Sequence, residues 1–362
     1  MDLCLAQAKQ ATPSCLPNPA VGAVIVGTNG AILGIGHTQP PGGAHAEIAA
    51  LRQAEGLGHD VKGATIYVTL EPCAHYGRTG PCALALIDAK ISKVVASIED
   101  PNPKVSGKGF QILRDAGVEV VIGPGSKESR ELNIGFFSRF VRERPWVRLK
   151  IASSMDGRTA LTNGRSQWIT GEPAREDGYA WRAKASAILT GIGTILKDNP
   201  RLDTRGKSIA KEPILAIVDS GLNTPPNANI FRIRRPVLIF TAIECNEKRT
   251  ALEVAGATVI YAPNLSSGKV DLDKVLAELA RREIGELHVE AGATLNGALI
   301  RAGLVDELIW YVAPKILGMG ASIADIGVLQ DISASPRFRF ISVDFVATDL
   351  CIVARNVNSD SF

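Results

Sequence analysis

Three residues of metal-ligating type, at fixed places in the first quarter of the chain, constrain the fold more than any other feature. The chain contains, in order, His45-Ala46-Glu47, Glu71-Pro72-Cys73 and Pro81-Cys82. A zinc ion with three protein ligands keeps a fourth position for water, whereas structural zinc sites are usually closed by four ligands. A fold that brings His45, Cys73 and Cys82 together is therefore predicted to hold a catalytic Zn2+ ion.

A carboxylate stands beside this ligand set. Glu47 follows His45 by two residues, close enough to move protons without binding the metal. The arrangement resembles that of zinc deaminases, in which a zinc-activated water attacks an amidine carbon and a glutamate transfers protons to the departing amine. Nucleobase deaminases generally have two residues between the cysteines, whereas residues 74–81 separate them here. In this longer loop, His75 and Arg78 suit a polar, phosphorylated substrate.

Less specific roles are open to the same residues. Cys73 and Cys82 also fit buried apolar positions or a disulfide, and His45 also fits the surface of a helix. Each short motif is weak evidence alone, but the set occurs in the right order and includes Glu47. The pattern therefore favours the zinc site.

Length and charge limit the class of protein further. A chain of 362 residues is expected to form two domains. The 40 Lys and Arg residues nearly balance the 37 Asp and Glu residues. The resulting net charge of +3 is too small to attract nucleic acid strongly by electrostatics. The six cysteines do not form a recognisable disulfide framework, and no apolar run reaches the roughly 20 residues that a membrane span needs. We expect a cytoplasmic protein that acts on a small molecule, binds neither nucleic acid nor membrane, and is compatible with a homo-oligomer.

Residues 1–144 alternate between strand-like and helix-like segments. Short runs rich in Val and Ile predict strands at 20–28, 64–70, 93–98 and 118–122. Helical composition predicts helices at 44–55, 82–90 and 107–116. This alternation predicts a layered α/β domain. His45 and Glu47 would then open one helix, Cys73 would follow a strand and Cys82 would begin the next helix, so that the ligands meet beyond strand ends.

A second series of predicted strands and helices begins near residue 145. Residues 140–145 form a charged segment closed by a proline, and 146–152 are typical of a strand, so we place the domain boundary between residues 144 and 145. Further strands are predicted at 188–191, 214–220, 237–241, 258–262, 286–290, 308–316, 338–346 and 349–357, and helices at 173–185, 271–283 and 294–302. The β-rich end after Glu307 predicts a mixed sheet with an antiparallel edge in residues 145–362.

A second candidate site begins where the predicted strand 286–290 ends. Residues 291–297 lead through small residues into a helix, and the N–H groups at a helix start attract anions such as the phosphates of a dinucleotide. Strand-glycine-helix turns are equally common as purely structural elements, and the segment is not the GxGxxG fingerprint. This motif alone does not distinguish the two roles.

Other segments add hydroxyl and guanidinium groups to the second half of the chain. They contain Ser166, Trp168, Arg182, Thr194, Asp198, Leu202 and Arg205. Several arginines and hydroxyl residues near strand ends suit a phosphorylated substrate beside a phosphorylated cofactor. Taken singly, each arginine is more often a solvated surface charge, and Trp168 is more often a core residue than a cofactor platform.

Together these motifs closely resemble one family, the bifunctional riboflavin-biosynthesis proteins that join a pyrimidine deaminase to a pyrimidine reductase. In the first half the resemblance rests on NPAVG (18–22), HAE (45–47), EPCAHYGRTGPC (71–82) and DPNP (100–103). In the second half it rests on SMDGRTA (154–160), SQWIT (166–170), DNPRL (198–202) and EAGATL (290–295). It implies a cytidine-deaminase-like three-layer domain at 1–144 and a dihydrofolate-reductase-like α/β domain with a mixed sheet at 145–362.

The resemblance also implies two consecutive reactions on one phosphoribosylated pyrimidine. The first is hydrolytic deamination of 2,5-diamino-6-(5-phosphoribosylamino)pyrimidin-4-one, and the second is NADPH-dependent reduction of the ribosyl group to ribityl. By position, the family assigns zinc to His45, Cys73 and Cys82 and proton transfer to Glu47. It assigns NADPH to Ala152, Trp168, Thr194, Asp198, Ser220, Gly292, Ala293, Thr294, Leu295, Asn296, Gly297 and Ala298. It assigns the reductase substrate to Ser166, Arg182, Leu202, Arg205 and Glu290, and the deaminase substrate to Asn18, His37, His75 and Arg78.

Two interpretations from other classes compete with this one. A nucleic-acid-editing deaminase would carry a similar zinc site but also a basic, aromatic-bearing surface, and aromatic residues make up only 5% of this chain. Alternatively, the second half is an inactive scaffold behind a working deaminase. NADPH binding would distinguish that hypothesis from a reductase.

Overall fold

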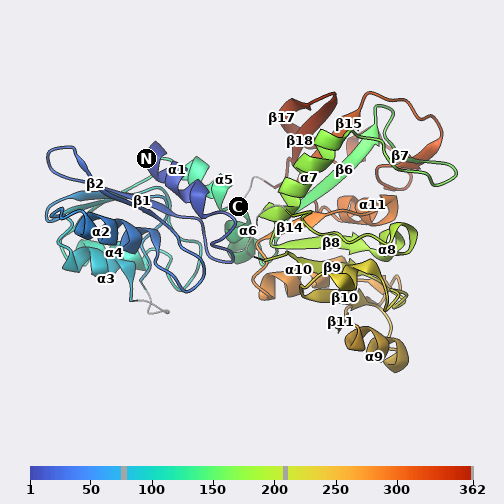
Figure 1. Ribbon diagram of the computed structural model, residues 1–362, viewed down its shortest axis with the longest axis horizontal. Helices are drawn as coiled ribbons and strands as arrows, with labels where there is room; N and C mark the ends of the chain where they lie inside the picture. The colour runs from blue at the N-terminus through green and yellow to red at the C-terminus, as the bar shows by residue number, and fades with distance from the viewer. Residues whose placement is uncertain (75–79, 207–210, 360–362) are drawn as a thin grey trace. The chain divides into compact units, whose positions relative to one another are not determined.

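Two units make up the chain in the computed structural model, which describes residues 1–74, 80–206 and 211–359. The units are Met1–Arg142 and Glu143–Phe362. His75 and Arg78, two of the candidate substrate contacts, lie outside the described residues. Both units are built from alternating helices and strands (Figure 1).

The first unit surrounds one five-stranded sheet with helices. Its helices are α1 (Asp2–Ala11), α2 (Ala46–Gly56), α3 (Cys82–Asp88), α4 (Lys108–Asp115), α5 (Ser126–Leu132) and α6 (Ile134–Arg142). Its strands are β1 (Gly22–Val26), β2 (Ile32–His37), β3 (Thr65–Val68), β4 (Lys93–Ala96) and β5 (Glu119–Ile122). The strand order is β2-β1-β3-β4-β5, with β1 antiparallel to β2 and β3, and with β3, β4 and β5 parallel. The predicted strands and helices of this part are therefore confirmed.

Strand β2 and helices α1, α5 and α6 were not predicted. In β2 the reason is Gly34 and Gly36, which interrupt the apolar pattern. Both glycines are required by packing, because a Cβ at Gly36 would lie 2.5 Å from the Ala46 carbonyl oxygen and one at Gly34 would lie 2.3 Å from that of Ala50. Helix α2 therefore lies directly against β2, and this close contact fixes where its first turn begins.

The second unit contains a nine-stranded sheet. Its strands are β6 (Trp146–Ser154), β8 (Ala187–Gly191), β9 (Ile214–Val218), β10 (Val237–Thr241), β11 (Ala257–Tyr261), β14 (Glu286–Val289), β15 (Glu307–Ala313), β17 (Phe338–Val346) and β18 (Asp349–Asn356). Two small pairs join β7 (Arg158–Leu161) to β16 (Gly320–Ser322) and β12 (Pro263–Asn264) to β13 (Lys269–Val270). The helices are α7 (Glu172–Lys184), α8 (Ile192–Asp198), α9 (Asn246–Val254), α10 (Leu272–Arg281) and α11 (Ala293–Arg301), with 3-10 turns at Asn229–Arg232 and Ile332–Ala334.

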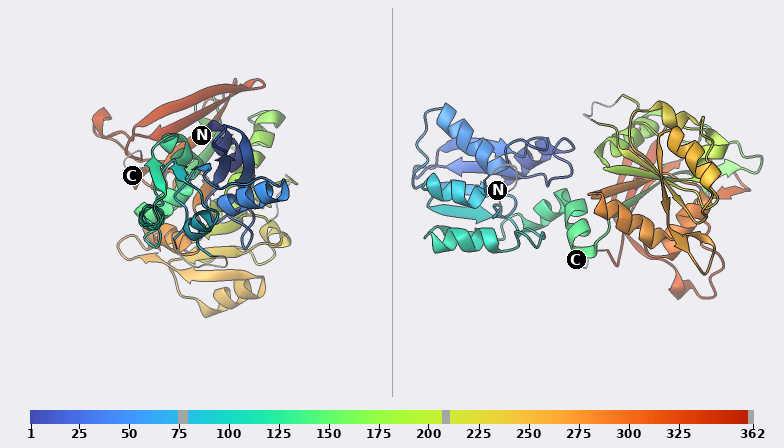
Figure 2. Two further views of the ribbon diagram at one scale, coloured as in Figure 1. Left: turned by 90° about the vertical axis from the view of Figure 1, so that its left-hand side faces the viewer. Right: turned by 90° about the horizontal axis from the view of Figure 1, so that it is seen from below.

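The order of this sheet is β11-β10-β9-β8-β14-β6-β15-β18-β17. The strands from β11 to β15 run parallel, whereas β18 is antiparallel to β15 and to β17. The predicted mixed sheet with an antiparallel edge is thus confirmed. The right-hand view of Figure 2 shows the strands fanning out as the sheet twists, with helices on both sides.

Alternating residues along the strands explain the three layers of this unit. Leu189, Ala216 and Leu238 belong to the core that includes residues of α10 and α11, whereas their neighbours in sequence pack in a second core with residues of α8 and α9. Helix α7 packs through Ala174 against Ile309 and Tyr311 of β15. Because side chains alternate between the two faces of a strand, each face buries its own apolar set.

Two details of this unit differ from the prediction. Strand β15 ends at Ala313, whereas the predicted strand ran to Ile316, because Pro314 has no N–H to continue the ladder. Helices α8 and α9 were not predicted; in α8, Gly191 and Gly193 suggest a loop. Within the described residues, every helix falls short of the length and apolar content needed to cross a membrane.

Candidate functional site

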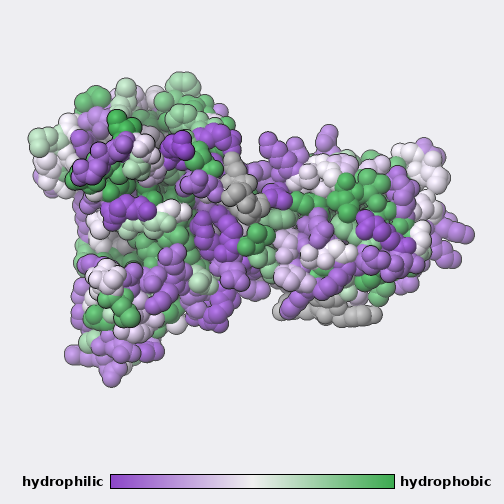
Figure 3. Space-filling view, turned by 180° about the vertical axis from the view of Figure 1, so that it is seen from behind, coloured by the Kyte–Doolittle hydropathy of each residue, from purple (hydrophilic) through white to green (hydrophobic). Residues whose placement is uncertain are grey.

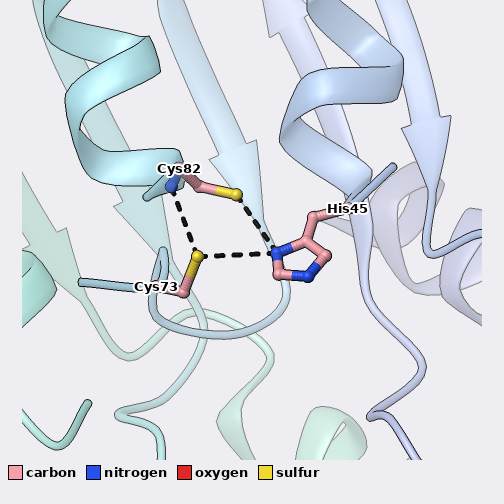
Figure 4. A group of neighbouring side chains, drawn as sticks. All are labelled: His45, Cys73 and Cys82. Atoms are coloured by element: carbon pink, nitrogen blue, oxygen red, sulfur yellow. Dashed lines mark hydrogen bonds between the residues drawn. The ribbon is translucent and has the colours of Figure 1, made fainter. Parts of the chain in front are cut away.

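His45, Cys73 and Cys82 converge in the first unit (Figure 4). His45 is the N-cap of α2, Cys73 follows β3 after a short segment, and Cys82 is the first residue of α3. The Sγ atoms of Cys82 and Cys73 lie 3.3 and 3.5 Å from His45 Nδ1, and the three donor atoms all lie within 4.8 Å of one another. The residues therefore occupy the places on helices and strands that the sequence pattern predicted.

This donor set fits a zinc ion. Two sulfurs and one imidazole nitrogen are ligands that zinc prefers, and tetrahedral coordination with Zn–S bonds of about 2.3 Å places neighbouring donors roughly 3.5–4 Å apart. Both cysteines are free thiols, so the disulfide alternative is wrong. Three protein donors leave one tetrahedral position for water, as the chemistry of hydrolysis requires.

The thiols of Cys73 and Cys82 share a hydrogen bond. The pKa of Cys73 is lowered to about 4, first because the Cys82 side chain hydrogen-bonds to it, and His45 and the Cys82 backbone N–H act in the same direction. The pKa of Cys82 is raised, because this thiol donates in the same hydrogen bond and is buried. The hydrogen bond with Cys73 also raises the pKa of His45. Cys73 is therefore ready to act as a thiolate ligand at the N-terminus of α3.

Glu47 lies in the first turn of α2, two residues after the N-cap His45, and is buried. Burial raises the pKa of Glu47 to about 7. A carboxyl group with a pKa near neutrality can accept a proton and release it again at physiological pH. The position and burial of Glu47 thus suit the proton transfer that the sequence pattern predicted.

The loop that carries Cys73 is fastened by a residue that the sequence analysis quoted without assigning a role. The buried Glu71 accepts hydrogen bonds from the backbone N–H groups of Gly109 (2.8 Å), Gly107 (2.9 Å), Asp100 (3.1 Å) and Phe110 (3.4 Å). Its carboxylate therefore ties the residues before Cys73 to the start of α4. The only signal in the sequence is its place in the EPC motif, since the donors lie up to 39 residues away.

Two further candidates for the deaminase substrate have defined positions. Asn18 lies in the turn after α1, where its N–H donates to the Cys15 carbonyl. His37 ends β2 and lies opposite Gly22 of β1. Its neighbour Gly36 contacts the first turn of α2, which begins beside His45.

In the second unit, Arg182 of α7 and Glu290, which follows β14, form a buried ion pair. Arg182 donates from Nε and Nη2 to the two carboxylate oxygens of Glu290 and from Nη1 to the carbonyl of Asp203 (2.8 Å). Arg182 is buried, so the alternative that it is a solvated surface charge is wrong. This network joins α7, the end of β14 and the loop after α8.

Two residues that were not predicted also surround Glu290. The Nε2 atom of His288 lies 3.1 Å from Glu290 Oε1, and the ammonium of Lys150 lies 4.0 Å from Oε2. Although burial opposes ionisation, Arg182 and then Lys150 lower the pKa of Glu290 well below its usual range. Burial also lowers the pKa values of His288 and Lys150. The sequence signal for His288 is its spacing of two from Glu290, which places both side chains on one face of the strand.

The loop after α8 combines strained backbone with cationic side chains. Asn199, Leu202 and Arg205 all have positive φ, at 39°, 51° and 53°. Such conformations cost energy in residues other than glycine and often mark functional segments. Arg201 and Arg205 are both exposed and form ion pairs with Asp203 at 2.7 and 3.2 Å. Arg205 is thus held next to the Arg182 network with its side chain open to a ligand.

The N-terminus of α11 is the predicted anion site. Gly292 is the N-cap, and Ala293, Thr294 and Leu295 form the first turn, in which Thr294 is exposed. Asn296 and Gly297 are buried instead, and a Cβ at Gly297 would lie 1.8 Å from the Asp325 carbonyl oxygen. Packing therefore explains Gly297, whereas the first turn is free to face a phosphate. Ala298 follows in the same helix and is half-buried.

The other predicted cofactor and substrate residues lie in β6, in α8 and in the loops that follow β7, α8 and β9. Trp168 is 62% exposed, with the guanidinium of Arg175 4.3 Å from its ring, so the alternative of a core residue is wrong. Leu202 is buried in the core, and its carbonyl accepts a hydrogen bond from Arg235. The remaining candidates are Ala152 in β6, Ser166 before Trp168, Thr194 and Asp198 in α8, and Ser220 after β9.

Similar proteins cover both units. Residues 1–98 match the cytidine and deoxycytidylate deaminase zinc-binding region, and residues 145–352 match the RibD C-terminal domain. The chain is 40% identical over 353 residues to the riboflavin biosynthesis protein RibD of Aquifex aeolicus, with 97% of this chain and 96% of the relative covered. It is 41% identical over 349 residues to the RibD protein of Escherichia coli, with 93% of each covered.

Solved structures give the same result. RibD of Acinetobacter baumannii (form 1) superposes with a TM-score of 0.88 at 38% identity, covering 98% of this chain and 97% of that chain. The diaminohydroxyphosphoribosylaminopyrimidine deaminase/5-amino-6-(5-phosphoribosylamino)uracil reductase of Thermotoga maritima superposes with a TM-score of 0.85 at 32% identity and the same coverage. The similarity therefore extends over the metal-ligating group and over the Arg182 network.

Proposed function

This chain belongs to the RibD family of bifunctional deaminase and reductase enzymes of riboflavin biosynthesis, and from that premise we propose which residues carry each reaction and on which substrate. In the first unit, His45, Cys73 and Cys82 hold Zn2+ for the hydrolytic deamination of 2,5-diamino-6-(5-phosphoribosylamino)pyrimidin-4-one. The observation that carries this assignment is the convergence of three donor atoms next to the buried Glu47. Family membership favours it over the nucleic-acid-editing deaminase that the sequence left open.

The deaminase mechanism follows from these residues. A bound zinc ion supplies an activated water as the nucleophile. Cys73 and Cys82 balance the charge of the ion, and the Cys82 N–H helps to hold Cys73 as a thiolate. Glu47 accepts a proton and delivers it to the ring amine as ammonia departs, since its raised pKa allows both steps near neutral pH. Glu71 keeps the Cys73 loop in place during this cycle.

In the second unit, we propose that NADPH reduces the ribosyl group of the deaminated substrate. The phosphates of the cofactor would bind at the first turn of α11, and Trp168 and the α8 segment would contact other parts of the cofactor, as the family resemblance assigns them. The hydride chemistry belongs to the nicotinamide, so the protein chiefly holds two anionic molecules in register. Arg205 would bind the substrate phosphate, and Arg182 would fix Glu290 at the substrate.

The decisive test of the deaminase assignment is Glu47→Gln, with Glu55→Gln at the exposed end of α2 as a matched control. We expect the Glu47 variant to retain a full complement of zinc and to lose about two to four orders of magnitude in deamination rate, because an amide cannot carry a proton. NADPH oxidation with substrate that is already deaminated should not change. Retention of more than about a tenth of the deaminase rate would exclude Glu47 as the proton carrier.

The reductase assignment is tested by titrating the full chain with NADPH. Saturable binding that depends on Trp168 and on the first turn of α11 would support it. No binding would favour the inactive scaffold. We also propose a cytoplasmic location, because all six cysteines are free thiols in the structure, as is usual in a reducing compartment.

A further inference from the structure

The short segment that carries Trp168 is fixed to two neighbouring strands. The ammonium of Lys315, two residues after β15, donates to the carbonyl oxygens of Ile169 (2.7 Å) and Trp168 (3.2 Å). The N–H of Gly171 donates to the buried carboxylate of Asp349 at the start of β18 (2.6 Å). The backbone on both sides of the indole is therefore held in place.

The Trp168 side chain itself is 62% exposed. Apolar residues lie at many places on the surface that Figure 3 shows, so exposure by itself does not mark a ligand site. What distinguishes Trp168 is the combination of an exposed indole with a backbone that is anchored by side chains from other elements. An exposed aromatic ring on a fixed backbone can bind another flat ring at a low cost in conformational entropy.

The guanidinium of Arg175 in α7 covers one face of this indole. Its central carbon lies 4.3 Å from the ring centroid, and its Nη1 donates to the Thr170 carbonyl (2.9 Å). Among the residues that the structure describes, no carboxylate forms an ion pair with Arg175, so a neighbouring anion does not neutralise its charge. The indole therefore has a cation on one face and is open to a ligand elsewhere.

The order of the strands indicates which part of a dinucleotide reaches Trp168. Strands β9, β8, β14, β6 and β15 are neighbours in that order and run parallel, so their carboxyl ends lie along one edge of the sheet. Ser220 follows β9, α11 begins after β14, and Lys315 ties Trp168 to the end of β15. With the phosphates at α11, in the middle of this edge, Ser220 and Trp168 would contact opposite halves of the cofactor.

The half at Trp168 is then the nicotinamide half. Ser166, which the family resemblance assigns to the reductase substrate, lies two residues before Trp168 in the same segment. The nicotinamide is the part of the cofactor that must contact the substrate for hydride transfer.

We propose, on the basis of the cofactor assignment proposed above, that Arg175 holds the indole of Trp168 against the nicotinamide and makes the site prefer the reduced cofactor to the oxidised one. The reduced ring is neutral, whereas the ring of NADP+ carries a positive charge. A cation on the far face of the indole repels only the oxidised ring. Arg175 is thus a positioning residue that favours binding of the cofactor to be consumed and release of the cofactor that has reacted.

The size of this preference follows from the distances. The guanidinium lies 4.3 Å from the indole centroid, and a ring stacked on the other face would lie about 3.5 Å from it, so the two charges would be about 8 Å apart. With an effective dielectric constant of about 40, between those of water and of a protein surface, this repulsion changes a dissociation constant about fivefold.

The test is calorimetric titration of the full chain with NADPH and, separately, with NADP+. We expect Arg175→Leu to lower the ratio of the NADP+ to the NADPH dissociation constant about fivefold. Arg175→Lys keeps the charge but not the planar stack, so it should weaken both cofactors and keep the ratio within about twofold of the wild-type value. Lys184→Leu is the matched control, because its ammonium lies 5.1 Å from the ring of Trp181 on the same helix, and it should leave both constants unchanged.

The ratio separates this role from a purely structural one. If Arg175 served only the fold, Arg175→Leu would weaken both cofactors equally, and that result would overturn the proposal. An unchanged pair of constants, or a ratio that falls as far in Lys184→Leu, would overturn it as well and would leave the cofactor assignment standing. If the wild-type chain bound neither cofactor, the cofactor assignment itself would be wrong, and this inference with it.

Discussion

Replacing Glu71 by glutamine should release the loop that carries Cys73. Oε1 of Glu71 accepts from Gly109 and Phe110, and Oε2 accepts from Gly107 and Asp100. An amide keeps one of these oxygens and turns an NH2 group toward two buried N–H donors. Hydrogen bonds to a charged group contribute about 1.5–3 kcal/mol each, so we expect the free energy of unfolding of the first unit to fall by about 3–5 kcal/mol. Since domains are stable by only about 5–15 kcal/mol, this is a large fraction of the total.

The chain offers a way to follow the two units separately. All four tryptophans, Trp146, Trp168, Trp181 and Trp310, lie in the second unit, so their fluorescence in urea reports on that unit, whereas far-UV circular dichroism reports on both. In Glu71→Gln we expect a circular dichroism transition at lower urea concentration that fluorescence does not follow. Zinc content and deaminase activity should fall with it, because Cys73 is no longer held. NADPH oxidation with deaminated substrate should persist.

Glu99→Gln is the matched control. Glu99 is an exposed carboxylate next to Asp100, in the loop between β4 and α4, and accepts a hydrogen bond from the Ser106 hydroxyl at 2.8 Å. Its replacement should change stability by no more than about 0.5 kcal/mol. If Glu71→Gln behaved like this control, the four backbone hydrogen bonds would not be what fastens the loop, and the reasoning would be refuted.

Three further predictions concern the two sites and the pH dependence of the first unit. Cys82→Ser should remove most zinc and deaminase activity while leaving the reductase reaction intact; joint loss of both activities would show that the units depend on each other. Arg205→Ala should raise KM for the phosphorylated pyrimidine about tenfold to a hundredfold and leave KM for NADPH nearly unchanged, and the opposite result in steady-state kinetics would mean that the two pockets are exchanged. Burial raises the pKa of Asp100 to about 7, above its value of about 3.9 in an unfolded chain, so the stability that this protonated group contributes is present below about pH 4 and is lost as the pH rises through 7. In urea titrations at several pH values, Asp100→Asn should remove up to about 4 kcal/mol of this pH-dependent fall in the free energy of unfolding. A variant whose free energy of unfolding falls with pH as steeply as that of the wild type would contradict the prediction.

Much of the candidate site could be predicted because its residues occupy ends of regular elements. The order of His45, Glu47, Cys73 and Cys82, together with the alternation of apolar runs and helical segments, predicted that the ligands would begin helices or follow strands. These are local properties of the chain, and the structure agrees with them. Strand β2 was not predicted because its glycines serve packing against α2, which is not a local property.

The sequence by itself determined the residue types, their spacing and the period of each segment, and hence the α/β class, the mixed sheet and the group of three residues of metal-ligating type. Only the tertiary structure decided which distant groups meet: Arg182 with Glu290, 108 residues apart, and Glu71 with Gly109, 38 residues apart. It also decided that Trp168 is exposed and that Arg175 covers one face of its indole. The physical reason is that periodicity records which face of an element is apolar, whereas hydrogen bonds and burial depend on what packs against that face.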